Sequence, residues 1–215
     1  MRKNTKFLFI ALAGLIFSSC AGETDTAIAD IEKTETCLYS YSADNSELKF
    51  TAFKFLGKTG VGGSFTEINV KGGEENENPI KVIENLSFDI PISSLSTKDE
   101  GRDAKIAEFF FGEINTTSLT GKVVRLEEDR KVAMILITMN GISNEVRGDY
   151  TLSEDGFFTY DAEINVFDWQ AEGGIARLNE ECKDLHTDFE KGDTESKLWP
   201  DVEISFSTQL KKNCE

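Results

Sequence analysis

Residues 157–166 read FFTYDAEINV, and this stretch indicates the fold of the chain. Apolar side chains stand at every second position from Phe158 to Val166, and polar or acidic side chains stand between them. A period of two is typical of a β-strand with one buried and one solvated face. The same period dominates the chain from residue 38 onward, so the sequence predicts a mainly β protein with antiparallel strands.

Four other segments carry strand patterns. Residues 86–90 and 202–210 alternate in the same way. Residues 48–55, LKFTAFKF, alternate at first and become apolar on both sides at their end. Residues 132–139, VAMILITM, are apolar almost throughout, which suits a strand that is covered on both faces.

The connections between these strands include one hairpin and two helices. Asn140-Gly141 is a strong hairpin signal, although Ser143-Asn144 could hold the turn instead. Residues 102–111, RDAKIAEFFF, predict a short helix, and residues 171–189 predict a longer one because their apolar residues recur at helical spacing. Antiparallel strands with two helical insertions suggest a barrel or a sandwich.

The front of the chain has the pattern of a secretory signal. Basic residues precede an apolar run of about eleven residues, which is shorter than the roughly twenty that a membrane-spanning helix needs. We therefore expect residues 1–19 to be a cleaved signal peptide. Residues 20–36 contain no aromatic residue and many carboxylates, so we expect an acidic disordered tether. The remaining residues, 37–215, suit one domain.

The cysteine at the expected cleavage site adds a lipid anchor to this interpretation. Phe17-Ser18-Ser19-Cys20 resembles the bacterial lipobox, in which the cysteine becomes the first mature residue and is acylated. The alternative is an ordinary signal peptide with a chance cysteine. The resemblance implies an envelope lipoprotein attached to a membrane through Cys20, and Ala21, in place of aspartate, favours the outer membrane. The domain would then lie in the periplasm or on the cell surface.

Charge and the remaining cysteines narrow the function further. A net charge of −16 argues against nucleic acid as a partner, because such binding needs basic patches.

An oxidising compartment favours one disulfide among Cys37, Cys182 and Cys214. If the first and last strands pair antiparallel, Cys37 meets Cys214, so we expect that disulfide. Cys182 and the single histidine, His186, do not make a metal site, because zinc needs three or four ligands. We therefore expect no metal and no cofactor.

Taken together, four segments resemble the YceI-like family, over about residues 39–210. They are SELKFTAFKFLGKTGVGGSFTEI, GRDAKIAEFFFG, ITMNGISNEVRGDYTL and KLWPDVEISFSTQLKK. The resemblance implies an antiparallel lipocalin-like β-barrel of about eight strands with two helical insertions, which would surround an apolar tunnel. It also implies a polyisoprenoid or another long-chain lipid as ligand. Many members have histidine where this chain has Lys54, so the head-group preference could differ.

The hypothesis favoured by these observations is a binding protein whose barrel holds a long apolar amphiphile. An apolar tunnel is sufficient for affinity without any catalytic group. For each candidate residue, core packing is the alternative to ligand contact. The candidate lining residues are Phe50, Phe88, Ile90, Leu136, Phe158, Tyr160, Ile204 and Phe206.

Two other functions are weighed beside lipid binding. The first is a structural or stress-related envelope protein whose barrel is filled by its own side chains. The second is a carboxylate-based hydrolase, which is disfavoured because no motif sets a carboxylate pair apart. Arg102 and Asp103 fit a helix cap and a surface ion pair better than catalysis. We therefore expect no enzymatic activity.

Overall fold

The computed structural model describes residues 35–215. The predicted signal peptide 1–19, the lipidation at Cys20 and residues 20–34 of the predicted tether lie outside the described residues and remain predictions. Within residues 35–215, no helix is long and apolar enough to cross a membrane.

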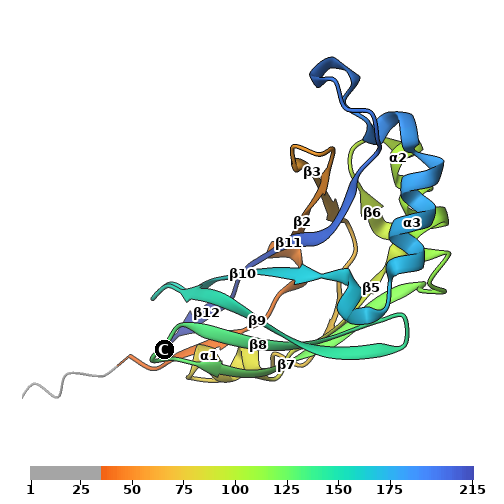
Figure 1. The fold of residues 1–215 in the computed structure, drawn as a ribbon. Coiled ribbons are helices and arrows are strands. Elements are labelled where there is room, and N and C mark those ends of the chain that lie inside the picture. The colour runs from red at the N-terminus through yellow and green to blue at the C-terminus, as the bar shows by residue number, and fades with distance from the viewer. Residues whose placement is uncertain (1–34) are drawn as a thin grey trace, which may run out of the picture. The chain divides into compact units, whose positions relative to one another are not determined.

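The central element is an antiparallel ten-stranded sheet that curls into a half-barrel (Figure 1). Its strands follow the order β4-β5-β7-β8-β9-β10-β11-β2-β3-β6. The strands are β2 (Ser46–Lys54), β3 (Thr59–Phe65), β4 (Asn69–Lys71), β5 (Ser87–Pro91), β6 (Leu95–Ser96), β7 (Ser118–Glu127), β8 (Val132–Met139), β9 (Ile142–Leu152), β10 (Phe157–Asn165) and β11 (Leu198–Gln209). The predicted antiparallel, lipocalin-like fold is confirmed. Because the short strands β4 and β6 form its two edges, the sheet has more strands than the predicted eight.

A separate two-stranded ribbon joins the two ends of the described chain. Strand β1 (Cys37–Ser40) pairs antiparallel with β12 (Lys211–Cys214), and this register places Cys37 opposite Cys214. The two cysteines form a disulfide, with Cα atoms 4.0 Å apart. The predicted pairing is therefore confirmed, as is the antiparallel contact of the first and last strands on which it depended.

The hairpin between β8 and β9 turns at Asn140-Gly141. Their φ angles of 51° and 69° place both residues in the left-handed region. This conformation is required at both central residues of a type I′ turn, and asparagine and glycine adopt it most readily. The Asn-Gly position of the turn is therefore the correct one of the two alternatives.

Two helices lie at one end of the sheet and one lies at the other (Figure 1). Helix α2 (Glu100–Lys105) continues into a π-helix, Ile106–Phe111, which confirms the helix predicted at 102–111. Helix α3 (Glu172–Glu181) is shorter than the predicted 171–189, because the chain passes into a 3-10 turn, Lys183–His186, after its last turn.

Helix α1 (Pro79–Glu84) lies at the opposite end of the sheet and was not predicted from the sequence. The Asn78 side chain accepts a hydrogen bond from the backbone N–H of Ile80, and Pro79 stands at the first helical position. Both are standard helix-start signals. Its side chains Ile80, Val82 and Ile83 are buried against the sheet.

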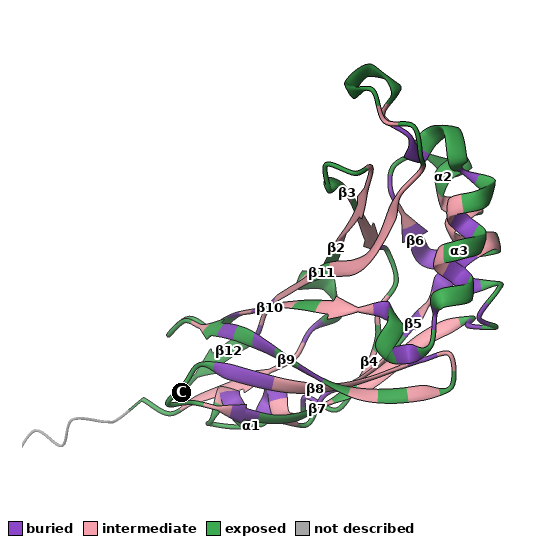
Figure 2. Ribbon diagram, in the orientation of Figure 1, coloured by how far each residue is buried: buried purple, intermediate pink, exposed green. Residues whose placement is uncertain are grey.

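The apolar core is divided into two clusters along the sheet (Figure 2). One cluster lies under α2 and α3 and includes Trp169, Phe110 and Phe111. The other lies beside α1 and includes Tyr150 and Phe158, whose rings stack with centroids 5.7 Å apart. The larger of the two apolar cavities described below is lined by residues of the first cluster, and the smaller one also by residues of the second.

Candidate ligand-binding cavity

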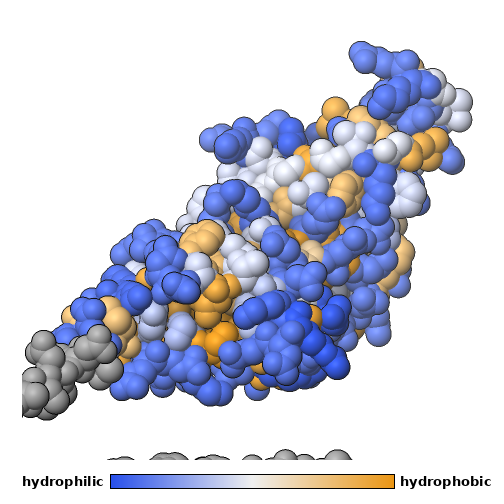
Figure 3. Space-filling view, turned by 90° about the vertical axis from the view of Figure 1, so that its left-hand side faces the viewer, coloured by the Kyte–Doolittle hydropathy of each residue, from blue (hydrophilic) through white to orange (hydrophobic). Residues whose placement is uncertain are grey.

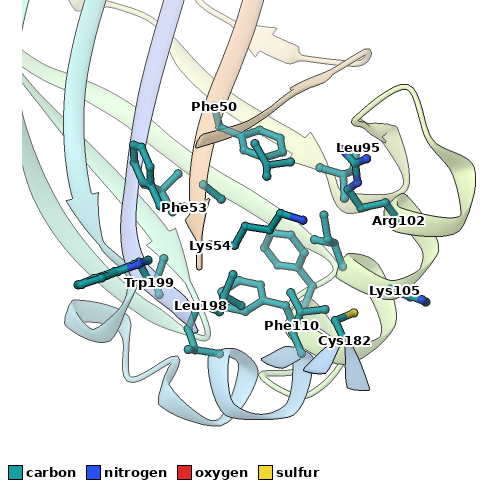
Figure 4. Close-up of a pocket in the computed structure, with 18 of the residues that line it drawn as sticks. Phe50, Phe53, Lys54, Leu95, Arg102, Lys105, Phe110, Cys182, Leu198 and Trp199 are labelled. Atoms are coloured by element: carbon teal, nitrogen blue, oxygen red, sulfur yellow. The ribbon is translucent and has the colours of Figure 1, made fainter. Parts of the chain in front are cut away.

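The concave face of the sheet and the helices α2 and α3 enclose a cavity of about 410 Å³ (Figure 4). Strands β2, β3 and β11 form one wall, and the segments 99–111 and 175–186 form the other. Most of the lining is apolar, including the rings of Phe50, Phe53 and Phe110. On the outside of the molecule, apolar residues gather in patches on an otherwise hydrophilic face (Figure 3).

A second, smaller apolar cavity of about 140 Å³ adjoins the first from within the sheet. The two cavities share side chains from several strands, among them Phe50 and Phe65, whose ring centroids are 5.8 Å apart. The shared lining residues are Phe50, Phe65, Leu119, Met139, Ile164 and Ile204. The two cavities therefore form successive parts of one apolar interior.

Seven of the eight candidate lining residues face this interior. Phe50 and Ile204 line both cavities. The others that line the smaller cavity are Phe88, Ile90, Phe158, Tyr160 and Phe206. Ile90, Phe158 and Tyr160 are also buried core residues. Whether these seven side chains contact a ligand remains a prediction.

Leu136 is the exception, and the prediction that it lines the interior is wrong. Its neighbours Ile135 and Ile137 line the smaller cavity, so Leu136 points to the opposite face of β8. On that face its cross-strand partners are Lys122 and Glu145, both of which are exposed. Because β8 is apolar on both faces, its sequence pattern does not distinguish the inner face from the outer one.

Residues from the helices line the larger cavity and were missed by the strand-based prediction. Ile106, Phe110 and Phe111 come from the helical segment after α2, and Leu178 and Cys182 come from α3 and its end. Their signal was present in the sequence as apolar residues at helical spacing. That pattern predicts a buried face and does not indicate that the face borders an open space.

Two inner rings lie on glycines of the neighbouring strand. The Phe50 ring covers Gly63, its cross-strand partner, where an added Cβ atom would come within 2.3 Å of the ring. Phe88 covers Gly121 in the same way, at 2.4 Å. Glycine at these positions lets the rings lie flat along the wall of the sheet, which keeps the interior open.

Charged side chains stand at the α2 end of the larger cavity. Lys54, at the end of β2, points into it, and its Nζ donates a hydrogen bond to the carbonyl oxygen of Leu185 at 2.8 Å (Figure 4). Arg102 points toward Lys54 from α2, and its guanidinium lies 3.5 Å from the carboxylate of Asp99. Arg102 therefore forms its surface ion pair with Asp99, so the expected pairing of Arg102 with Asp103 is wrong. Asp103 accepts hydrogen bonds from Thr97, and the helix cap is Asp99.

His186 and Cys182 are both buried in the wall of this cavity. His186 Nδ1 lies 3.0 Å from Asn179 Oδ1. Burial, together with the charges of Lys54 and Lys105, lowers the pKa of His186 to about 4, so the ring is neutral at pH 7. Burial also raises the pKa of the Cys182 thiol. Among residues 35–215, no three or more His, Cys, Asp or Glu side chains are grouped so that they could hold a metal.

Residues 39–210 match the family model of the YceI-like domain. No curated protein matches the sequence. Among solved structures, the chain is similar to a polyisoprenoid binding domain from Saccharophagus degradans implicated in plant cell wall breakdown, with 11% identity and a TM-score of 0.57 over 83% of this chain and 99% of that one. It is also similar to BcnA of Burkholderia cenocepacia, with 12% identity and a TM-score of 0.52 over 80% of this chain and 99% of that one. At these identities the likeness shows the fold.

Proposed function

This chain belongs to the YceI-like domain family, and from that premise we propose that it binds the apolar chain of a long amphiphile, such as a polyisoprenoid, inside its curled sheet. The observation that carries the proposal is the apolar interior formed by the cavities of about 410 and 140 Å³. Burying an apolar chain there would contribute about 25 cal/mol per Å² of surface removed from water. The fold shared with a polyisoprenoid binding domain supports the same ligand class.

The size of this interior favours ligand binding over a protein whose half-barrel is filled by its own side chains. Natural cores contain few voids larger than a water molecule. A void of about 410 Å³ lined by apolar groups is within the range of small-molecule sites. Lipid binding therefore explains the open space, and a self-filled structural protein does not.

A cavity-filling substitution tests the proposal. Ala52 lines the larger cavity, so Ala52→Phe should fill part of it and lower the affinity for a fluorescent or radiolabelled isoprenoid about tenfold or more. The neighbouring Thr51 points to the other face of β2, so Thr51→Phe is the matched control and should bind as the wild type does. Titration of each purified variant with the labelled lipid measures the effect.

Mass spectrometry of organic extracts provides an independent test. Protein purified from its native host should carry a lipid that the Ala52→Phe variant lacks. An extract without any lipid, together with equal affinities of the Ala52→Phe and Thr51→Phe variants for added isoprenoid, would contradict the proposal.

We further propose that the protein is a lipid-anchored component of the cell envelope, attached through Cys20 and directed mainly to the outer membrane. The lipobox-like sequence and the disulfide Cys37–Cys214 support this location, because disulfides persist in oxidising compartments. Cells grown with labelled palmitate should incorporate the label into the wild type and not into Cys20→Ala. Equal labelling of both, or recovery of unmodified wild type from the cytoplasm, would overturn the anchor.

A further inference from the structure

The charges that line the apolar interior are concentrated at one end. Four charged side chains stand at the α2 end of the larger cavity, namely Lys54, Asp99, Arg102 and Lys105. The smaller cavity adds only Lys49, whose side chain is 59% exposed and whose ammonium is paired with Glu47 at 2.7 Å. A ligand lying along this interior would therefore have apolar surroundings at the end within the sheet and charged surroundings at the α2 end.

This charged end has an excess of positive charge. Of the carboxylates in the described chain, Asp99 alone lines this end, and it is already engaged by the backbone N–H of Arg102 at 3.0 Å and by the Arg102 guanidinium. Within residues 35–215, neither Lys54 nor Lys105 has a carboxylate at ion-pair distance. The excess is notable in a chain whose net charge is −16.

The neighbouring groups do not neutralise this excess. Burial and the positive charge of the nearby Arg102 lower the pKa of Lys54. Both side chains line the same end of the cavity (Figure 4). Asp188 also lies near Lys54, but its carboxylate pairs with Lys191 at 2.9 Å. His186 is neutral at pH 7, so it adds no charge of either sign. Lys105 stands at the rim and points away from the cavity centre (Figure 4).

We propose that this end of the cavity binds an anionic head group, a phosphate or a carboxylate, on the apolar chain of the ligand, with Lys54 and Arg102 as its principal contacts. The inference rests on the proposed lipid-binding function and adds the chemistry of the head group. A lysine ammonium binds such an oxyanion as a point charge, and the arginine fork can donate two parallel hydrogen bonds to it. An anion between the two cations would also relieve their mutual repulsion.

A pair of ligands with the same chain tests the proposal. Geranylgeranyl monophosphate and geranylgeraniol differ only in the head group, so their affinities for the full domain separate head-group binding from chain binding. We expect the phosphate to bind about tenfold more tightly at low ionic strength, and added salt to reduce this difference. Lys54→Gln and Arg102→Gln should each lower the affinity for the phosphate more than the affinity for the alcohol, so the preference for the phosphate should fall.

Two control variants and one competitor complete the design. Lys54→Arg keeps the charge and should retain the preference, and Lys71→Gln, on the exposed edge strand β4, should leave both affinities unchanged. Inorganic phosphate should not displace the lipid phosphate, and displacement at equal concentration would identify a free anion as the ligand instead. Equal affinities for the two lipids would overturn the head-group proposal and leave lipid binding intact. Failure of both lipids to bind would overturn the proposed function itself.

Discussion

His186 shows how one buried side chain links the stability of this protein to pH. Its pKa is about 4 in the folded protein and about 6.5 in an unfolded chain, because burial and the nearby cations Lys54 and Lys105 disfavour the charged ring. Between these two values the unfolded chain binds a proton that the folded protein does not. The free energy of unfolding should therefore fall as the pH is lowered from about 6.5 to about 4, by up to about 3 kcal/mol in total.

Denaturant titrations at several pH values measure this effect. The variant His186→Gln keeps a polar partner for Asn179 and does not titrate, so its free energy of unfolding should lack this part of the pH dependence. The pKa of Asp188 is also lowered, so its effect on stability falls below about pH 4. That effect should be the same in the wild type and the variant. If wild type and variant lose stability equally between pH 6.5 and 4, His186 does not have the depressed pKa.

Among single residues, the sequence predicted inner positions best where a strand has one polar face. Phe158 and Tyr160 alternate with Thr159 and Asp161, and both point inward as predicted. Strand β8 has no polar face, so the sequence did not show that Leu136 points outward. The role of Lys54 was also left open, because its direction depends on the place where β2 ends beside Leu185.

At the scale of elements, long strands and the Asn-Gly hairpin could be predicted, and short helices with local start signals were overlooked. Helix α1 begins with Asn78 and Pro79, but the acidic turn before it resembles a loop. Helix α3 was predicted too long because Leu185 continues its apolar spacing, yet Leu185 is 56% exposed beyond the helix end. Spacing alone does not reveal that the chain has left the helix to form the rim of a cavity.

At the scale of the whole domain, helices α2 and α3 lie at one end of the curled sheet and strand β12 lies at the other (Figure 1). The helices line the larger cavity and β12 carries Cys214 of the disulfide, so cavity and disulfide are at opposite ends. The sequence predicted the disulfide from the positions of Cys37 and Cys214, whereas the cavity depends on how two helices distant in the sequence cover one end of the sheet. This separation means that the disulfide can stabilise the fold without taking part in ligand binding.

Removal of the disulfide should therefore lower stability and leave binding intact. Cys37 and Cys214 are separated by 177 residues in the sequence, so their bond restricts the unfolded chain strongly. The double variant Cys37→Ala/Cys214→Ala should lose about 2–5 kcal/mol of unfolding free energy in denaturant titrations, and a reductant should destabilise the wild type by a similar amount. The buried thiol variant Cys182→Ala keeps the disulfide, so it should remain sensitive to reductant. A double variant that is as stable as the wild type, or that loses isoprenoid affinity while still folded, would contradict this separation of stability from binding.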